Sequence, residues 1–271
     1  MLSLNLGPLA MGIAHLILLA ALASSLLIGL WTARRTRGQS PESMLFNAFI
    51  GGLLVARLAF VLRYADQYRS DLWRVIDIRD GGFALWPGLA ASLLVVAITA
   101  LRRPAMRRPL LAGACAGLLV WAAGQAWVGH QQATTELPHL VLRTAKGAPV
   151  QLSDYQGQPL VINLWATWCP PCRREMPVLE QARLARTDVR FLFVNQGESA
   201  AVVVNFLDAA GLSASPVVFD PESELARQLG AAALPTTLFF GADGQLLGSH
   251  LGELSRASLT DALKVFDAPP P

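Results

Sequence analysis

Four apolar stretches, each close to the roughly 20 residues that a lipid bilayer requires, constrain the fold of this chain more than any other feature. They cover residues 9–31, 44–62, 83–101 and 110–127. The first is unlike a cleavable signal peptide, because no Lys or Arg precedes it and its basic residues follow it. We therefore expect the N-terminal half to be an all-α membrane domain with four transmembrane helices in the lipid bilayer.

Charge is distributed unevenly along the 271 residues. Residues 1–132 contain 12 Lys and Arg against 5 Asp and Glu, a net charge of +7, whereas residues 133–271 contain 10 against 14, a net charge of −4. The arginine blocks adjoin apolar stretches, as membrane-flanking charge does, and we expect no nucleic-acid partner.

Arginine placement also predicts the orientation in a membrane. The connections after the first and third stretches are basic, whereas the connection between the second and third balances four Arg with four Asp. Basic connections stay cytoplasmic, so an even number of spans places the N-terminus and the C-terminal half outside. We predict a multi-pass protein of the bacterial inner (cytoplasmic) membrane, with both of these parts in the periplasm.

Arg57 lies within the second apolar stretch, where a charge is costly. It either faces a polar cavity or partner, or extends toward the outer interface, and the residues alone leave both possibilities open.

Three motifs in this half, "LGPLAMGIAHLILL", "GGLLVARLAFVLRY" and "IRDGGFALWPGLAA", resemble the first part of prolipoprotein diacylglyceryl transferase. The resemblance covers about residues 5–125, and Arg57 matches the arginine of a family motif. The family's catalytic histidine falls on Trp86, and an indole cannot transfer protons as that histidine does. The resemblance implies a truncated membrane domain of shared ancestry and argues against acyl transfer.

The polar segment "GHQQATTELPH" separates the two halves, and we predict a membrane domain at 1–130, a linker at 131–138 and a second domain at 139–271. After residue 139, short β-rich runs alternate with helical patterns. A β-rich start followed by β-α-β-α-β-α-β-β-α predicts an α/β domain with a central mixed sheet and helices on its faces.

Cys169 and Cys172 lie in "WATWCPPCRREMP", where a buried strand leads into a helix. A structural zinc site needs four ligands, and a disulfide across so short a loop stabilises little. Dithiol chemistry fits better, because a helix N-terminus favours a thiolate and lowers the pKa of its cysteine. Cys169 would attack a partner disulfide and Cys172 would resolve the mixed disulfide. Cys115 has no partner cysteine in the membrane half, and we interpret it as a packing residue.

The second half resembles the TlpA/ResA/DsbE-like branch of membrane-tethered thiol–disulfide oxidoreductases, which have a thioredoxin fold. The motifs "NLWATWCPPCRREMP", "VNQGES", "LPTTLFF" and "DGQLLGSHLG" carry the match, over about residues 137–267. The resemblance implies that Pro235 is a cis-proline facing the disulfide and that Trp168 flanks the cysteines. It also places Glu175 and Glu198 near the site, while the buried aspartate of thioredoxin falls on Asn163.

Two of these assignments have plain structural alternatives. Glu175 could be a solvated first-turn residue favoured by the helix dipole, and Glu198 could be an acid that caps a helix.

The predicted function is that of a membrane-anchored, extracytoplasmic oxidoreductase that reduces disulfides of envelope proteins through its CPPC dithiol. The resemblance implies cytochrome c apoproteins or metallochaperones as substrates, and a DsbD/CcdA-type membrane protein as electron donor. The alternatives are a dithiol oxidase and a membrane protein related to prolipoprotein diacylglyceryl transferase. We expect no cofactor and no metal.

Overall fold

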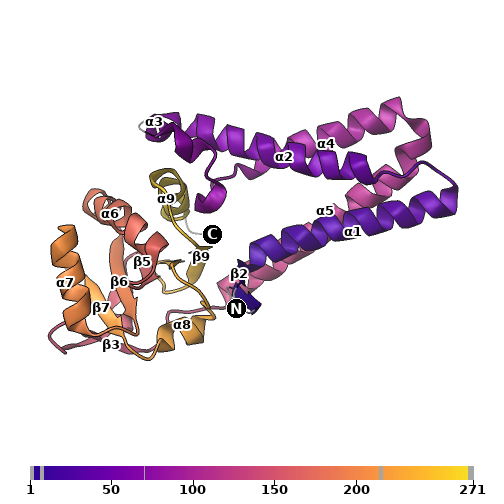
Figure 1. Ribbon diagram of the computed structural model, residues 1–271. Coiled ribbons are helices and arrows are strands. Elements are labelled where there is room, and N and C mark those ends of the chain that lie inside the picture. Colours follow the sequence, from indigo (N-terminus) through magenta and orange to yellow (C-terminus); the bar gives the residue numbers. More distant parts are fainter. Residues whose placement is uncertain (1–2, 7–8, 70, 214–215, 268–271) are drawn as a thin grey trace. The chain divides into compact units, whose positions relative to one another are not determined.

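The structure is a computed structural model that describes residues 3–6, 9–69, 71–213 and 216–267 (Figure 1). The chain divides into two compact units. One is helical and comprises residues 13–128; the other contains residues 129–271 together with residues 1–12.

Four long helices form the helical unit, as the apolar stretches predict. They are α1 (Ile13–Thr36), α2 (Glu42–Arg63), α4 (Leu85–Arg102) and α5 (Pro104–Ala133), and each is long and apolar enough to cross a membrane. Helices α2 and α5 extend beyond the predicted stretches because helical geometry continues into flanking polar residues. The predicted start of the first span is wrong: Leu9–Gly12 form strand β2, which pairs with β1 (Ser3–Leu6), and α1 begins after Gly12, a poor helix former.

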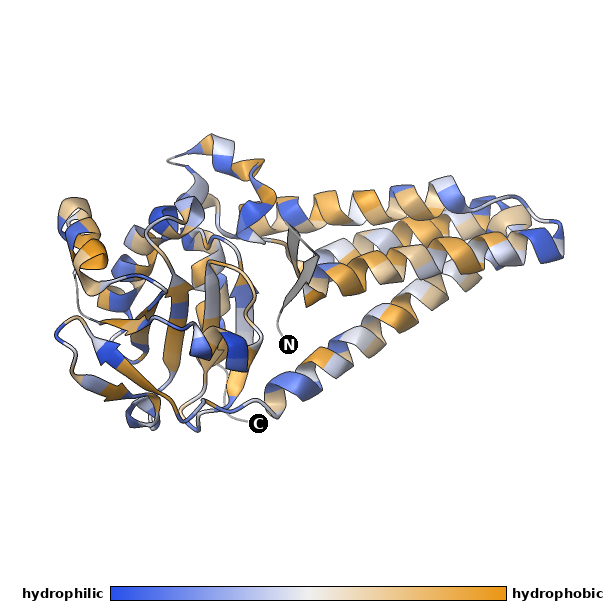
Figure 2. Ribbon diagram, turned by 60° about the horizontal axis from the view of Figure 1, so that its bottom comes forward, coloured by the Kyte–Doolittle hydropathy of each residue, from blue (hydrophilic) through white to orange (hydrophobic). Residues whose placement is uncertain are grey.

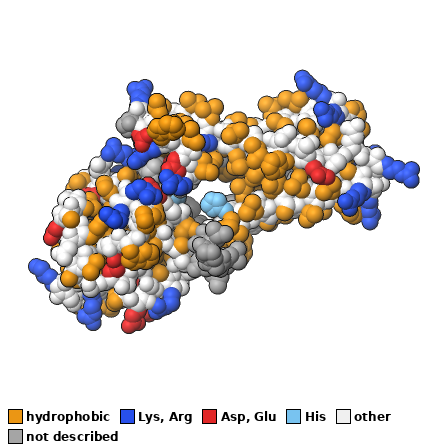
Figure 3. All heavy atoms as spheres, in the orientation of Figure 1, with side chains coloured by type: hydrophobic (Ala, Val, Ile, Leu, Met, Phe, Trp, Pro, Cys, Tyr) orange, Lys and Arg blue, Asp and Glu red, His pale blue; other side chains and the backbone are white. Residues whose placement is uncertain are grey.

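Hydrophobic residues predominate along the long helices of the helical unit (Figure 2), and many of their side chains are exposed. Leu27, Leu54, Leu62 and Leu119 are each about two-thirds exposed or more. Such a surface suits hydrocarbon rather than water. Figure 3 shows Lys and Arg side chains gathered at the end of this unit where α1 joins α2 and α4 joins α5.

Helices α2 and α4 pack closely because glycines face each other across their contact. A Cβ atom on Gly52 would lie 2.9 Å from the Gly88 carbonyl oxygen, and one on Gly88 would lie 2.7 Å from the Ala56 Cβ. The Ser92 hydroxyl donates a hydrogen bond across the same contact to the Ala48 carbonyl, at 3.0 Å. Small residues and an interhelical hydrogen bond are the usual means of helix association in lipid.

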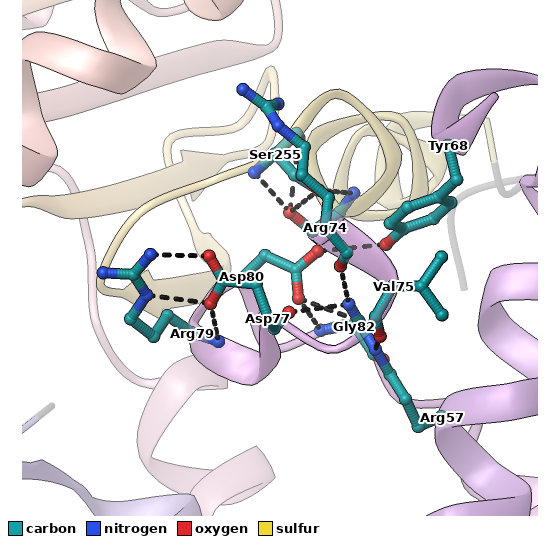
Figure 4. A network of polar contacts seen from close by, with 10 residues as sticks. Arg57, Tyr68, Arg74, Val75, Asp77, Arg79, Asp80, Gly82 and Ser255 are labelled. Carbon is teal, nitrogen blue, oxygen red and sulfur yellow. Dashed lines mark hydrogen bonds and ion pairs between the residues drawn. The ribbon is translucent and has the colours of Figure 1, made fainter. Parts of the chain in front are cut away.

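The connection between α2 and α4 is ordered by a polar cluster centred on Arg57 (Figure 4). This connection contains α3 (Ala65–Tyr68) and two short 3-10 helices, η1 (Leu72–Val75) and η2 (Ile78–Asp80). The Arg57 guanidinium forms an ion pair of 2.9 Å with Asp80, which also accepts a hydrogen bond from the Tyr68 hydroxyl. It further donates to four backbone carbonyls of the connection, those of residues 74, 75, 77 and 82.

Arg57 therefore holds a loop in place instead of extending toward the interface. It is 7% exposed, and five acceptors within its own unit satisfy its guanidinium. The sequence left open whether Arg57 faces a polar environment or extends toward the outer interface. The structure shows the polar environment, and residues of the same chain form it.

The second unit is built on a seven-stranded mixed sheet with the order β4-β3-β7-β6-β5-β8-β9. The strands are β3 (Val141–Thr144), β4 (Pro149–Gln151), β5 (Leu160–Trp165), β6 (Arg190–Gln196), β7 (Val217–Asp220), β8 (Thr236–Phe240) and β9 (Leu246–Leu251). Strands β5, β6 and β7 run parallel, and the other pairings are antiparallel. Hairpins join β3 to β4 and β8 to β9, with Gly147 and Gly244 at positive φ in their turns.

Helices cover both faces of this sheet, as predicted for a thioredoxin-like α/β domain. Alternate residues of β5 face opposite cores: Val161 and Trp165 pack with α6 (Pro170–Ala185), α7 (Ala200–Ala210) and α9 (Arg256–Ala262), which η4 (Leu263–Phe266) extends. Leu160, Ile162 and Leu164 pack with α8 (Glu224–Leu229) and the 3-10 helix η3 (Leu152–Tyr155).

The segment predicted as a linker is partly regular structure. Helix α5 continues to Ala133, and the residues after it pair with the β8–β9 hairpin. The Leu137 N–H donates to the Gly244 carbonyl at 2.8 Å, and the Leu246 N–H donates to the Thr135 carbonyl at 2.9 Å. The polar composition predicted a linker between two domains, and it does not reveal these distant backbone partners.

We predict that Asp80→Ala destabilises the helical unit by about 3–5 kcal/mol, because it leaves the buried Arg57 charge without its carboxylate. Thermal unfolding in detergent should show a clear fall in Tm. Asp66→Ala is the matched control: its pair with Arg69 is more than three-quarters exposed on both sides, and its removal should change little. Equal Tm values for the two variants would contradict the clamping role of Arg57.

Candidate active site

The two cysteines lie where β5 leads into α6. Cys169 is the N-cap residue of α6 and forms a disulfide with Cys172, which lies in its first turn. Cys169 is 3% exposed and Cys172 is fully buried, whereas Trp168 beside them is 68% exposed. Cys172 is therefore the more deeply buried of the two cysteines.

A single hydrogen-bond donor at the start of α6 faces the Cys169 sulfur. The Cys172 N–H lies 3.3 Å from this atom. Pro170 and Pro171 occupy the intervening positions, where the missing N–H groups cost the helix little. The same absence removes two donors that could stabilise a thiolate, so the Cys172 N–H and the helix dipole remain to do so.

Glu175 lies in the second turn of α6 and is fully buried, so the alternative of a solvated first-turn residue is wrong. Its carboxyl accepts hydrogen bonds from the Asn163 amide at 2.8 Å and from the Leu254 N–H at 3.0 Å. Burial raises the pKa of Glu175 to about 8, although the two hydrogen bonds oppose this shift. Because residues three apart share a helix face, Glu175 and Cys172 lie on the same side of α6.

Asn163 joins Glu175 to the strand on the other side of β5. Its amide nitrogen also donates to the Thr237 hydroxyl at 3.0 Å, and its amide oxygen is buried without a hydrogen-bond partner among the described residues. Amide oxygen and nitrogen exchange places by a flip of the side chain. In the flipped orientation, the oxygen would accept from both the Thr237 hydroxyl and a protonated Glu175, so this site accommodates either charge state of the carboxyl.

Glu198 fixes the loop before the cysteines. Its carboxylate accepts hydrogen bonds from the Thr167 N–H and from the Asn195 amide, each at 2.7 Å, and from the Thr167 hydroxyl. The alternative of a helix-capping acid is wrong, because Ser199 is the N-cap of α7 and the Glu198 side chain is directed to Thr167. Glu198 therefore binds Thr167, which lies two residues before Cys169 in the chain.

Pro235 follows a cis peptide bond, as the resemblance implies. Its carbonyl accepts a hydrogen bond from the Gly252 N–H at 2.9 Å, which holds the segment before β8 against the segment after β9.

Three residues that bind the two glutamates of the site were not identified from the sequence. Thr167, Asn195 and Leu254 bind the two glutamates, and Leu254 does so through its backbone alone. The Leu254 N–H lies 79 positions along the chain from Glu175, and any residue type can supply a backbone donor, so no sequence pattern marks this contact. Thr167, within "WATWC", could have been found from its place beside the cysteines.

Comparison with known proteins separates the two halves of the chain. Residues 132–265 match the Redoxin family, and residues 2–128 match the prolipoprotein diacylglyceryl transferase family. Thiol-disulfide oxidoreductase ResA of Bacillus subtilis is 29% identical over 134 residues, which are 49% of this chain and 74% of that protein. ResA of Geobacillus kaustophilus is 32% identical over 124 residues, 45% of this chain and 71% of that protein.

This chain belongs to the ResA family of thiol–disulfide oxidoreductases. A solved structure of a thiol:disulfide interchange protein of the thioredoxin family from Chlorobium tepidum is 27% identical and covers 48% of this chain and 94% of its own, with a TM-score of 0.43. The ResA-like domain is fused to a membrane half that resembles prolipoprotein diacylglyceryl transferase, as the sequence predicts.

The arrangement can perform the dithiol chemistry of the ResA family. A sulfur at a helix N-terminus, a second sulfur one turn away and a carboxyl with a pKa of about 8 provide a nucleophile, a resolving thiol and a proton acceptor.

Glu175 should make the stability of this protein depend on pH. Its pKa is about 8 in the folded chain against an ordinary value of 4.5, so between these values the folded chain keeps a proton that the unfolded chain has lost. The resulting stability is complete below pH 4.5, decreases as pH rises and is lost as pH passes about 8. Unfolding by denaturant across this range should show a decrease of a few kcal/mol that is absent in Glu175→Gln. Parallel curves for the two proteins would contradict the buried, protonated carboxyl.

Proposed function

We propose that this protein is a membrane-anchored, extracytoplasmic oxidoreductase that reduces disulfides of envelope proteins. The observation that carries the proposal is the Cys169–Cys172 pair at the start of α6, with the buried Glu175 on the same helix face. Membership of the ResA family supports the chemistry, and the four apolar helices support a membrane location.

The reaction begins from the reduced dithiol. The Cys169 thiolate attacks one sulfur of the partner's disulfide, forms a mixed disulfide and releases the partner's other sulfur as a thiolate. Glu175 then accepts the proton of the Cys172 thiol, and the Cys172 thiolate attacks the Cys169 sulfur. The partner leaves reduced, and the protein is left with the Cys169–Cys172 disulfide. A pKa near the working pH suits Glu175 to this proton transfer.

Side chains around the dithiol have supporting roles in this proposal. Glu198 positions the loop before Cys169 through Thr167. Trp168, which is largely exposed, and Pro235 provide surface and backbone for the docking of a partner segment.

Renewed reduction needs electrons from outside this chain. Cys115 is a lone cysteine in α5, and electron transfer across a bilayer by thiol exchange needs a pair. We propose a DsbD/CcdA-type membrane protein as the donor, and cytochrome c apoproteins or metallochaperones as the substrates.

The charge distribution supports an extracytoplasmic ResA-like domain. Arg34 and Arg35 lie in the last turn of α1 and Arg102 in the last turn of α4. Figure 3 shows Lys and Arg side chains gathered at the end of the helical unit where α1 joins α2 and α4 joins α5. Basic ends of spans remain in the cytoplasm, and four spans return the chain to the side from which it began.

The two family positions that the structure describes, Trp86 and Arg57, do not support acyl transfer by the membrane half. Trp86 stands where the related family has its histidine, and it is 75% exposed on the first turn of α4. Arg57, which matches a family arginine, is already bound by five acceptors in its own unit.

The reduction potential separates a reductase from a dithiol oxidase. We expect equilibration with glutathione or dithiothreitol to give a potential well below that of the strong oxidant DsbA, about −120 mV. A potential close to the DsbA value would favour the oxidase.

Cys172→Ser should accumulate partners as mixed disulfides on Cys169, because the resolving thiol is gone. Mass spectrometry of the complexes, isolated from cells without reductant, should identify envelope proteins. Cys115→Ser is the matched control and should trap nothing. Recovery of the same complexes from Cys169→Ser would show that another thiol forms them and would contradict the proposed nucleophile.

The proposed orientation predicts which engineered cysteines a membrane-impermeant thiol reagent can reach in intact cells. In a Cys115→Ser background, Asp66→Cys in the α2–α4 connection should react. Arg35→Cys at the end of α1 should react only after lysis. The reverse pattern of labelling would place the ResA-like domain in the cytoplasm and contradict its proposed extracytoplasmic location.

A further inference from the structure

A shallow pocket of about 420 Å³ lies beside the reactive cysteine. Its lining consists of Pro170, Arg173 and Arg174 of α6 and Phe206 and Ala210 of α7. Residues three and four positions after Pro170 share its helix face, so the two arginines and the proline form one wall. Pro170 follows Cys169 directly in the chain, so this wall begins one residue after the cysteine that would bond to a partner.

The pocket has an apolar floor and a cationic rim. The Phe206 ring is half-buried and packs against Trp165, with 5.8 Å between ring centroids. The guanidinium of Arg173 lies over the outer side of this ring, 5.4 Å from its centroid. Stacking of this kind holds an arginine in place while its N–H donors remain available to a ligand.

The two arginines differ in how far their charge is compensated. Arg174 forms an ion pair of 2.6 Å with Glu253. Arg173 is exposed, and no hydrogen bond or ion pair of its side chain occurs within the part of the chain that the structure describes. Residues 133–271 carry a net charge of −4, so Arg173 is a cation uncompensated by the described residues in a domain that is acidic as a whole.

We propose that this pocket selects partners with an acidic side chain close to the cysteine that Cys169 attacks. The inference rests on the proposed function and specifies its substrate class. A carboxylate would accept hydrogen bonds from Arg173 while an adjacent apolar group packs on Phe206. Four residues of extended chain reach about 13–14 Å, so we look for the acidic residue within about four positions of the partner's cysteine.

The test uses peptides whose single cysteine is bonded to 2-nitro-5-thiobenzoate. The Cys169 thiolate attacks the peptide sulfur, a peptide–Cys169 disulfide forms, and the coloured thiolate is released. Glu or Lys occupies, one at a time, each of the four positions on either side of the cysteine. The protein is the full chain in detergent, with Cys115→Ser and Cys172→Ser so that Cys169 is the reacting thiol.

The ratio of the Glu-peptide rate to the Lys-peptide rate is the measured quantity, because it cancels any change in the reactivity of Cys169 itself. At one or more positions we expect a ratio of roughly three to ten at low salt, which high salt should reduce. Arg173→Glu should invert the ratio. Lys146→Glu, which makes the same charge change in the exposed β3–β4 turn, should leave it unchanged.

A Glu preference that survives Arg173→Glu, or equal rates for Glu and Lys at all positions, would overturn the proposed pocket while leaving the dithiol chemistry intact. Release of no coloured thiolate from any peptide would instead refute the proposed function, together with the inference that rests on it.

Discussion

The contact between the Cys172 N–H and the Cys169 sulfur is the interaction on which the redox site depends. Two prolines precede this N–H and neither can donate, so the thiolate would receive one backbone hydrogen bond where other sequences would allow more. A less stabilised thiolate has a higher intrinsic nucleophilicity. It also makes the reduced form of the dithiol less stable, so the corresponding disulfide is harder to reduce.

The second constraint is the buried carboxyl of Glu175. Its hydrogen bonds come from β5 and from the segment between β9 and α9, so it connects three parts of the domain that are remote in sequence. An ionised carboxylate at this depth would be costly, which is why its pKa rises to about 8. In the proposed mechanism, the same burial that costs stability at high pH gives the dithiol a proton acceptor whose pKa lies near neutral pH.

In the membrane half, the buried polar residue Arg57 has a structural role. Arg57 and Asp80 are buried together, and the arginine orders the connection between α2 and α4. With Trp86 at the family's histidine position, the helical unit keeps a scaffold that resembles prolipoprotein diacylglyceryl transferase while lacking the side chain that would use it. In the fusion, this scaffold is suited to hold a ResA-like domain at a membrane.

The sequence alone determined the features that depend on composition along a short stretch. Four apolar runs of bilayer length predicted the four helices, a short apolar run predicted the buried strand β5, and the CPPC motif after this strand predicted a dithiol at a helix start. Tertiary structure alone decided the environments of Glu175, Glu198 and Arg57. The burial and hydrogen bonds of these side chains come from residues far along the chain, such as Leu254 for Glu175 and Thr167 for Glu198. The atoms that surround a charged group after folding determine its pKa and its role, and the residues next to it in the sequence do not specify those atoms.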